Sequence, residues 1–535
     1  MERDRRGALW QAACRDADDG AGARLHVSDL VRALSDGGST TSGSDPARAS
    51  VEERPRVLHW FRSDLRLEDN TAFSAAAVRA SRLATVFVFD DVLLEGPGMR
   101  GPRLRFVHGC VTSLRDALSR RGHELLVLRG DPRVVVPELA RSLDVQVVTW
   151  NRDPGAYARR RDAAVAAALD SSGRRGVSFK DHVVFEASEV APCQDRPIAV
   201  YSPYRKAWWR RHAQAPPRAP RVWSLPPGFE AWPETALPTL PLLGATIDGA
   251  TIETPGEAAA QQRLTCFLEN AGASYRENRD RPALDATSRL SAAIRFGTIP
   301  IRECFRRAAE AIEDDPRRRA GLEKWIDELI WREFYQAILD EDPTRAWRNH
   351  RPEFDAMEWE EDDEGFDRWS TGRTGYPFVD AGIRELRATG HMHNRLRMVV
   401  ASFLTKHLLI DWRRGERHFF EALVDGDPAS NNGGWQWAAS TGTDPQPYFR
   451  IFNPVSQGER WDPEGRYVRR WVPELRDLDA RVLHAPWKAD RPIPGYPAPI
   501  VEHKAARERA LEAFAAARAG RQADRAEGQA DRAER

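Results

Sequence analysis

The sequence predicts two domains, a parallel α/β domain followed by a long linker and an all-helical domain. Three observations support this fold class: strands and helices alternate near the N-terminus, a proline-rich stretch follows, and the remaining pattern is almost purely helical. Alternating strands and helices are typical of a parallel sheet with helices on both faces. A chain of 535 residues is also too long for one simple core.

Five segments of the first domain are short and rich in β-branched or aromatic residues, as expected for strands. They are VLHWF (57–61), ATVFVF (84–89), ELLVLRG (124–130), VQVVTW (145–150) and VSF–HVVF (177–185). Between them lie helical segments such as 103–122. No GxGxxG follows the first strand, so the usual dinucleotide-binding fingerprint is missing.

Composition sets the expected boundaries. Residues 1–54 include SDGGSTTSGSDPARAS and are predicted to be a disordered extension. Residues 55–185 form the predicted α/β domain, and the proline-rich residues 186–255 an irregular interdomain linker. Residues 256–517 form the predicted helical domain, and the charged repeat at 518–535 is predicted to be a disordered tail.

The bulk composition excludes several classes of protein. No apolar run is long enough to span a bilayer, and the first residues lack the apolar core of a signal peptide. Five scattered cysteines without a CxxC pair argue against a disulfide framework or a zinc site, so a cytoplasmic protein without a metal is expected. The net charge is zero, which neither favours nor excludes a nucleic-acid partner. No Ser-His-Asp arrangement, P-loop or HExxH occurs.

The segment ELIWREFY has the spacing of a helix with two different faces. One face carries a carboxylate, an indole, a guanidinium and a phenol, from Glu328, Trp331, Arg332 and Tyr335. The other face carries Ile330, Phe334 and Ala337, which can pack into a core. The polar-aromatic face is poor core material, so a ligand or substrate surface is favoured over a solvated face with a salt bridge.

Three other segments fit a binding site but are weaker signals taken alone. In HMHNRLRM, Asn394, Arg397 and Met398 share a helix face with His391, a pattern usual for ordinary surface. The hydroxyls of TSRLS (287–291) could cap a helix, the favoured interpretation, or hold phosphate. The loop DGDPASNN (425–432) forms turns, and its two carboxylates could also meet a cationic or hydroxylated partner.

Tryptophan is abundant, with 18 residues, most of them after residue 320. Trp435 and Trp437 follow an Asn-Asn-Gly-Gly run; if this segment is helical, one indole can face a buried chromophore while the other faces outward. Trp412 and Trp359 are isolated in sequence, and spacing does not distinguish them from ordinary core or surface residues. The residues alone therefore predict a helical half that binds a flat aromatic, phosphate-bearing ligand.

Residues 57–517 resemble the DNA photolyase and cryptochrome family. The resemblance is carried by WFRSDLRLEDN, YSPYRKAWWRR, TSRLS, ELIWREFY, RTGYPFVDAGIREL, HMHNRLRM, LIDWRRGER and NNGGWQW, in the family's order. It implies an N-terminal α/β antenna domain and a helical catalytic domain that holds FAD in a U-shaped conformation. Within the family, the sequence is most similar to class I cyclobutane pyrimidine dimer photolyases.

The resemblance also assigns residues to the flavin. The positions that hold the FAD phosphates match Tyr275, Thr287, Ser288, Arg289, Leu290 and Ser291. Arg397 and Asp425 match a salt bridge beside the isoalloxazine, and Asp427 matches a further flavin contact. Asn431 matches the side chain that faces flavin N5.

Two further sets are implied by the same resemblance. Trp435, Trp412 and Trp359 match the proximal, middle and distal members of an electron-transfer chain that photoreduces the flavin. The face that receives a flipped-out lesion matches Arg279, Glu328, Trp331, Asn394, Met398 and Trp437, with Arg332 and Tyr335 on the same helix face. The implied catalytic set is Trp435, Trp412, Trp359, Glu328 and Asn431.

The implied activity is light-driven repair of UV-damaged DNA by a monomeric deoxyribodipyrimidine photo-lyase, in which reduced FAD donates an electron to a cyclobutane dimer and then recovers it. Asn394 and Met398 favour this class over a (6–4) photolyase, although His391 stands where the family commonly has tryptophan. A cryptochrome-like photoreceptor is the alternative, and a non-catalytic DNA-binding flavoprotein is a third. Tyr157 and Ala158 replace the Asn-Glu pair of folate-binding members, which favours a deazaflavin antenna or an empty antenna pocket.

Overall fold

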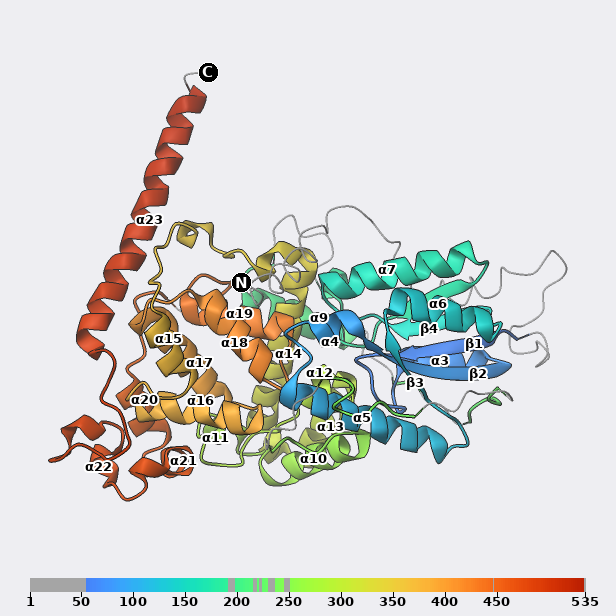
Figure 1. The fold of residues 1–535 in the computed structure, drawn as a ribbon, viewed down its shortest axis with the longest axis horizontal. Helices are drawn as coiled ribbons and strands as arrows, with labels where there is room; N and C mark the ends of the chain where they lie inside the picture. The colour runs from blue at the N-terminus through green and yellow to red at the C-terminus, as the bar shows by residue number, and fades with distance from the viewer. Residues whose placement is uncertain are drawn as a thin grey trace.

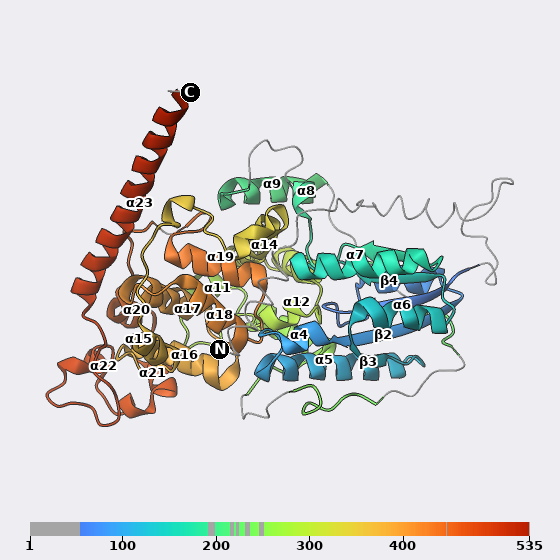
Figure 2. The same ribbon diagram turned by 45° about the horizontal axis from the view of Figure 1, so that its top comes forward.

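The computed structural model describes residues 54–190, 198–214, 219–220, 224–229, 236–244, 251–445 and 447–533, the last helix without side chains beyond residue 519. The predicted extension at 1–54 lies outside these residues except for Arg54. Figures 1 and 2 show a sheet domain beside a larger helical body, with the C-terminal helix along the outer edge of that body. Within the described residues, no helix is both long and apolar enough to cross a membrane.

Each of the five predicted segments contains a strand, and the strands form one parallel sheet in the order β3-β2-β1-β4-β5. The fifth strand ends at Phe179, so the prediction is wrong for residues 182–185. The strands are β1 (Arg56–Phe61), β2 (Arg82–Asp90), β3 (Leu126–Gly130), β4 (Val147–Asn151) and β5 (Arg175–Phe179). Alternate residues of β1 pack into different cores, because successive side chains of a strand point to opposite faces. Both faces of the sheet are therefore buried, as predicted.

Helices cover the two faces of the sheet in pairs (Figure 1). α3 (Thr71–Arg79) and α5 (Gly101–Ser119) pack on one face, and α6 (Pro132–Ser142) and α7 (Ala156–Ser171) on the other. The short α4 (Asp91–Glu95) follows β2 directly.

The linker contains more regular structure than predicted. After α8 (Ala187–Val190), residues Tyr201–Gln214 form the helix α9. Tyr201, Tyr204 and Trp208 follow helical spacing and are buried against the helical domain. The prediction of an irregular linker is therefore wrong for this segment. It was based on the proline content of the whole stretch and did not take the helical spacing of the aromatic residues of α9 into account.

The helical domain is arranged around the long helix α14 (Arg319–Glu341). Its other α-helices are α10 (Glu257–Asn270), α11 (Tyr275–Asn278), α12 (Ser291–Arg295), α13 (Ile301–Asp314), α15 (Asp363–Ser370), α16 (Pro377–Thr389), α17 (Asn394–Ser402), α18 (Trp412–Ala422), α19 (Pro428–Ala439), α20 (Pro454–Trp461), α21 (Arg466–Trp471), α22 (Ala480–Leu483) and α23 (His503–Ala533). Single turns connect them: η3 (Pro316–Arg318), η4 (Pro343–Ala346), η5 (Pro352–Phe354), η7 (Pro473–Leu475), η8 (Pro486–Lys488) and the π-helical η6 (Phe403–His407).

The charged C-terminal segment differs from its prediction. Residues 518–533 continue α23 as helix instead of forming a disordered tail (Figure 1). Its repeats are rich in Ala, Arg, Glu and Gln, which have high helix propensity. The start of α23 is anchored, because Ala510, Phe514 and Ala517 pack with Phe354 and Leu409.

A buried group of charges joins the two domains. Arg302 of α13 binds Asp181 and Asp69 of the α/β domain, with Nη2–Oδ1 distances of 2.7 and 2.8 Å. Arg66 binds the same Asp181 at 2.7 Å and donates to the carbonyl of Gly297 in the helical domain at 3.1 Å. Breaking a buried pair leaves an uncompensated charge, so this cluster strongly favours one docking of the domains.

We predict that Asp181→Asn lowers the free energy of unfolding by about 3–5 kcal/mol at neutral pH, because Arg66 and Arg302 lose their shared carboxylate. Although burial alone would raise it, the two arginines lower the pKa of Asp181 to about 2. Stability from a depressed carboxyl pKa is present above the unfolded value of about 3.9 and is lost as pH falls through the folded value. Wild-type stability should therefore fall between about pH 4 and 2, and less so in the variant.

Denaturant unfolding at several pH values checks this prediction. The pKa of Asp69 is instead raised, mainly by burial, so the acid-dependent loss belongs to Asp181. Asp479→Asn is the matched control, because Asp479 forms an exposed pair with Arg481 and should matter little. Equal stability of wild type and Asp181→Asn at neutral pH would contradict the prediction.

Candidate functional site

A cavity of about 520 Å³ opens in the helical domain, a size typical of cofactor sites. Its walls come from α11, α12, α14, α17, α18 and α19, together with the loop before α19. Sixteen of the residues singled out from the sequence line it: Tyr275, Arg279, Ser288, Ser291, Glu328, Trp331, Arg332, Tyr335, Asn394, Arg397, Met398, Asp425, Asp427, Asn431, Trp435 and Trp437. Segments far apart in the chain therefore meet at one site.

The two predicted faces of ELIWREFY are confirmed in α14. Glu328, Trp331, Arg332 and Tyr335 all border the cavity. Ile330, Phe334 and Ala337 lie in the apolar core behind them. The helical period alone assigns each residue of α14 to the cavity face or to the core face, so the two faces could be predicted from the sequence.

Trp331 is supported from behind by a residue that the sequence analysis missed. The ring of Tyr201 on α9 stacks on the Trp331 indole, with centroids 3.7 Å apart and an interplanar angle of 9°. The Tyr201 hydroxyl donates to the carbonyl of Asp327 on α14 at 2.9 Å. Tyr201 belongs to the YSPYRKAWWRR segment, but only tertiary packing reveals its contact. The indole is thus held in one plane at the edge of the cavity.

Two cations hold Glu328 at the cavity mouth. Arg279 donates to its Oε1, and Lys324, one turn earlier on α14, lies 2.9 Å from the same atom. Arg332, on the same face of α14, is directed away from Glu328 and toward the α/β domain. It donates to the carbonyl of His182 at 2.9 Å, so its guanidinium is directed at the α/β domain.

The loop before α19 carries two ionised carboxylates. Arg397 donates to Asp425 at 2.8 and 3.1 Å, which forms the ion pair implied by the resemblance. Asp427 caps α19 by accepting from the amide of Ser430 at 2.8 Å, and it also accepts from Gln336 at 3.0 Å. Burial would raise both pKa values, but the nearby arginines hold them below the usual range. Both side chains are therefore negatively charged at neutral pH.

Asn431 is oriented by a residue that no sequence signal identified. Its Nδ2 donates to Oε1 of Glu416 at 2.8 Å and to the Glu416 carbonyl at 2.9 Å. The amide oxygen of Asn431 is thus left to act as an acceptor at the cavity wall. Burial raises the pKa of Glu416 to about 7.

The TSRLS segment contributes fewer side chains than the resemblance implies. Ser288 and Ser291 line the cavity, and Ser288 accepts from Trp325 Nε1 at 3.3 Å. Arg289 has a left-handed backbone, with φ of 50°, and its guanidinium pairs with Glu253 outside the cavity. Leu290 is buried in the core, and the carbonyl of Thr287 accepts from Arg263. The side chains of Thr287, Arg289 and Leu290 therefore do not line the cavity.

The three tryptophans of the implied relay belong to one apolar cluster. Trp435 is buried and lines the cavity, where Phe419 and Trp369 meet it edge-on with centroids 4.9 and 6.0 Å away. Trp412 is buried at the start of α18, and its Nε1 donates to Asn349 at 2.9 Å. Trp359 is half-buried against Phe514 of α23, with centroids 6.4 Å apart. Trp437 shares α19 with Trp435, and both border the cavity.

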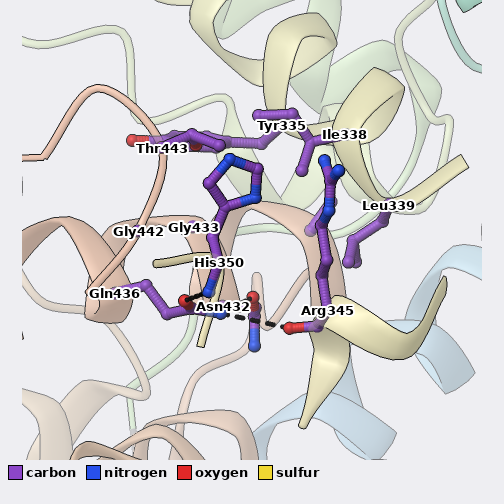
Figure 3. A pocket seen from close by; sticks show the side chains of 11 residues that line it. Tyr335, Ile338, Leu339, Arg345, His350, Asn432, Gly433, Gln436, Gly442 and Thr443 are labelled. Carbon is purple, nitrogen blue, oxygen red and sulfur yellow. Dashed lines mark hydrogen bonds between the residues drawn. The ribbon is translucent and has the colours of Figure 1, made fainter. Parts of the chain in front are cut away.

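A small second cavity lies next to Tyr335, and hydrogen bonds of its lining residues hold α19 in place (Figure 3). At about 10 Å³ it has room for roughly one water molecule. Gln436 accepts from the amide of His350 at 2.9 Å and donates to the carbonyl of Arg345 at 3.1 Å. The helix that carries Asn431 and Trp435 is thereby tied to the loop after α14.

His391 does not line the main cavity. Its Nδ1 lies 3.4 Å from Oε1 of Glu385, whose other oxygen accepts from the Tyr467 hydroxyl at 2.6 Å. The imidazole therefore belongs to a polar group beneath α17. Among the described residues, no cluster of side chains could hold a metal ion.

The cavity fits a flat, anionic cofactor. Five basic side chains and three carboxylates line it, which leaves a positive surplus for a diphosphate. The buried Nε1 of Trp435 has no hydrogen-bond partner among the described residues. A Cβ added at Gly434, on the cavity wall, would meet no atom within 4 Å, so this glycine leaves open space.

Comparison with known proteins agrees with this geometry. The model of the FAD binding domain of DNA photolyase matches residues 325–516, and the DNA photolyase model matches residues 57–221. The chain is 41% identical over 459 residues to deoxyribodipyrimidine photo-lyase from Synechococcus sp., covering 84% of this chain and 94% of that one. The corresponding Escherichia coli enzyme is 39% identical over 480 residues, covering 87% and 99%.

Solved structures show the same architecture. A bacterial class III photolyase from Agrobacterium tumefaciens superposes with a TM-score of 0.80 at 36% identity, covering 89% of this chain and 99% of that one. A cryptochrome from Synechocystis sp. PCC6803 gives a TM-score of 0.77 at 27% identity, covering 86% and 99%. The chain belongs to the DNA photolyase family, as a FAD-binding enzyme of the deoxyribodipyrimidine photo-lyase type.

Proposed function

We propose that this protein repairs cyclobutane pyrimidine dimers in DNA under blue light. The observation that carries the proposal is that one cavity joins the flavin set to the lesion set. Arg397, Asp425 and Asn431 of the first set line this cavity together with Trp331 and Trp437 of the second. When bound, reduced FAD supplies the photoexcited electron that opens the cyclobutane ring and takes the electron back afterwards.

The protein's own residues bind and orient the lesion. A damaged pair costs less to extrude from the duplex than an intact one, which favours entry of the dimer into the cavity. Trp331 and Trp437 stack on the flipped bases, at roughly 1–3 kcal/mol per base. Tyr201 keeps the Trp331 ring in plane, and Glu328 and Asn394 supply polar contacts at the mouth.

Asn431 would face the reactive edge of a flavin bound in this cavity. Because its Nδ2 is occupied by Glu416, its oxygen is the atom presented to the cofactor. An acceptor at this point favours a protonated nitrogen on the flavin, as in the reduced form. Glu416 therefore acts through Asn431 rather than on the cofactor itself.

The two alternatives differ in which residues they need. A cryptochrome-like photoreceptor requires the flavin set but not the lesion set, and both sets line this cavity. A (6–4) photolyase typically carries a histidine pair on the lesion face, where this chain has Asn394 and Met398. Both features support cyclobutane dimer repair.

We predict that the reduced, FAD-loaded protein restores an oligonucleotide carrying a cyclobutane dimer under blue light and leaves a (6–4) product unchanged. Chromatography of the oligonucleotides before and after illumination measures both reactions. Repair of the (6–4) product alone would assign the other class. Flavin photoreduction with neither lesion repaired would favour the photoreceptor.

The same assay tests the lesion face. Trp331→Ala should weaken binding of the damaged oligonucleotide by about tenfold or more, since one stacking surface is lost, while FAD stays bound. Trp487→Ala is the matched control, because this indole is 41% exposed on η8 and does not line the cavity. Unchanged affinity in Trp331→Ala would mean that the lesion face is wrongly assigned.

We propose further that electrons pass from Trp359, the outermost member, through Trp412 to Trp435 and from there to the flavin. Their burial decreases along the series from Trp435 and Trp412 to the half-buried Trp359. Trp435→Phe should abolish photoreduction of oxidised FAD, followed by absorption, but retain repair after chemical reduction. Normal photoreduction in this variant would remove Trp435 from the relay.

We place the antenna site at the carboxyl ends of the strands, where open parallel sheets bind ligands. Tyr157 donates to Asp90 at 2.6 Å there, and Nη2 of the buried Arg62 has no hydrogen-bond partner among the described residues. An archaeal photolyase from Sulfolobus tokodaii, 31% identical with a TM-score of 0.75, holds two FAD molecules, which implied a novel light-harvesting cofactor in that protein.

We favour a deazaflavin over a folate, because Tyr157 and Ala158 replace the Asn-Glu pair of the folate-binding subgroup. Protein purified from its native source should release a second chromophore with the mass of a deazaflavin on denaturation. Release of a folate would contradict this assignment, and release of FAD alone would indicate an empty antenna pocket.

A further inference from the structure

Arg103 extends from the α/β domain into the wall of the flavin cavity. It lies on α5, is buried, and reaches across to the end of α18 in the helical domain. Its Nε and Nη2 donate to the carbonyl of Leu423 at 3.0 and 2.6 Å. It also donates to the carbonyls of Phe420 and Gly98, and its guanidinium lies 4.7 Å from the Phe420 ring centroid. One arginine thus satisfies the free carbonyls at a helix C-terminus.

The charge of Arg103 is not neutralised by a direct partner. All its hydrogen-bond acceptors are backbone carbonyls, and no carboxylate of the described residues forms an ion pair with it. Burial lowers the pKa of Arg103 to about 9, so the guanidinium still carries its proton at neutral pH. A buried cation without a direct ion-pair partner is unusual, because its desolvation is unfavourable. The carboxylates of Asp425, Asp427 and Glu421 act on Arg103 without a direct ion pair.

A single glycine separates this cation from the cavity. Gly426 lines the cavity between Asp425 and Asp427, and a Cβ at Gly426 would collide with Nη2 of Arg103. Asp425 is paired with Arg397, and Asp427 accepts from Gln336 and Ser430. The two neighbouring carboxylates therefore already have partners of their own.

We propose that Arg103 is a positioning residue of the flavin site, supplied by the α/β domain. It holds the Leu423–Asp427 segment against the cofactor, and its charge, which has no ion-pair partner among the described residues, favours the anionic reduced form of FAD. Two electrons and one proton convert neutral oxidised flavin into a form with one added negative charge. A nearby buried cation stabilises that charge in the low dielectric of the interior. The inference rests on the proposed use of reduced FAD.

The test measures the midpoint potential of bound FAD without DNA, by equilibration with a reference dye. Arg103→Met should shift the potential to more negative values and weaken FAD binding by about tenfold. Arg103→Lys keeps the charge and should stay near wild type at about pH 6; it should then shift negative as pH rises, since a buried lysine loses its proton below its usual pKa. Arg129→Met is the control, because this arginine of the same domain forms an exposed pair with Asp91.

Two results would overturn the proposal. One is an unchanged potential in Arg103→Met; the other is a potential in Arg103→Lys that is as negative as that of Arg103→Met at every pH, down to values at which a buried lysine is protonated. If Arg103→Met does not fold, the pH dependence of the FAD midpoint potential in Arg103→Lys tests the proposal instead. A pH dependence equal to that of the wild type would refute the role of the charge. Failure to repair dimers would refute the proposed function but leave these potentials unaffected.

Discussion

The docking of the two domains through Asp181, Arg66 and Arg302 is the constraint on which the site depends. Each of these charges is buried, so each needs its partners in place. Apolar contact alone would tolerate sliding between domains, whereas hydrogen-bonded charges are satisfied in one arrangement. That arrangement brings Arg103 of α5 to the end of α18 and His182 to Arg332. The helical domain supplies the lining residues of the cavity, and the α/β domain supports that lining from behind through Arg103 and His182.

Helix α14 connects the core to the chemistry. On its buried side, Glu333 accepts from Trp208 Nε1 at 2.6 Å and from the amides of Val184 and Phe185. Burial raises the pKa of Glu333, and these donors oppose that shift by stabilising its charged form. On its other side the same helix presents Glu328 and Trp331 to the cavity. Helix α9 is thereby bound to α14, which is what places Tyr201 behind Trp331.

Charge around the cavity is distributed in two layers. Asp425 and Asp427 lie at the wall and stay ionised because arginines face them. Behind and beside them, Arg103, Arg295, Arg332 and Arg397 provide more positive charge than the two carboxylates remove. Such a surplus suits a cofactor that carries a diphosphate and becomes more negative on reduction.

Features that depend on local period and composition were predictable from the amino-acid sequence. The five strands, the two faces of α14 and the grouping of Asn394, Arg397 and Met398 follow from spacings of two or of three to four residues. The long motifs identified the family, because their amino-acid sequences and their order along the chain match those of the family. Composition gave wrong predictions for two segments. The proline-rich surroundings of α9 indicated an irregular linker, and the charged repeat at the end of α23 indicated a disordered tail, but both segments are helical.

Which side chains act together depends on the packing of the folded chain and was not predictable from the sequence. Tyr201 stacks on a ring 130 positions away in the chain, Glu416 orients Asn431 across two helices, and Arg103 reaches the carbonyl of Leu423 in the other domain. The left-handed turn at Arg289 points its side chain out of the site that its motif suggests. The physical reason is that a hydrogen bond or ring contact acts over a few ångströms, and the packing of the domains, not the spacing in the chain, brings such partners within that range.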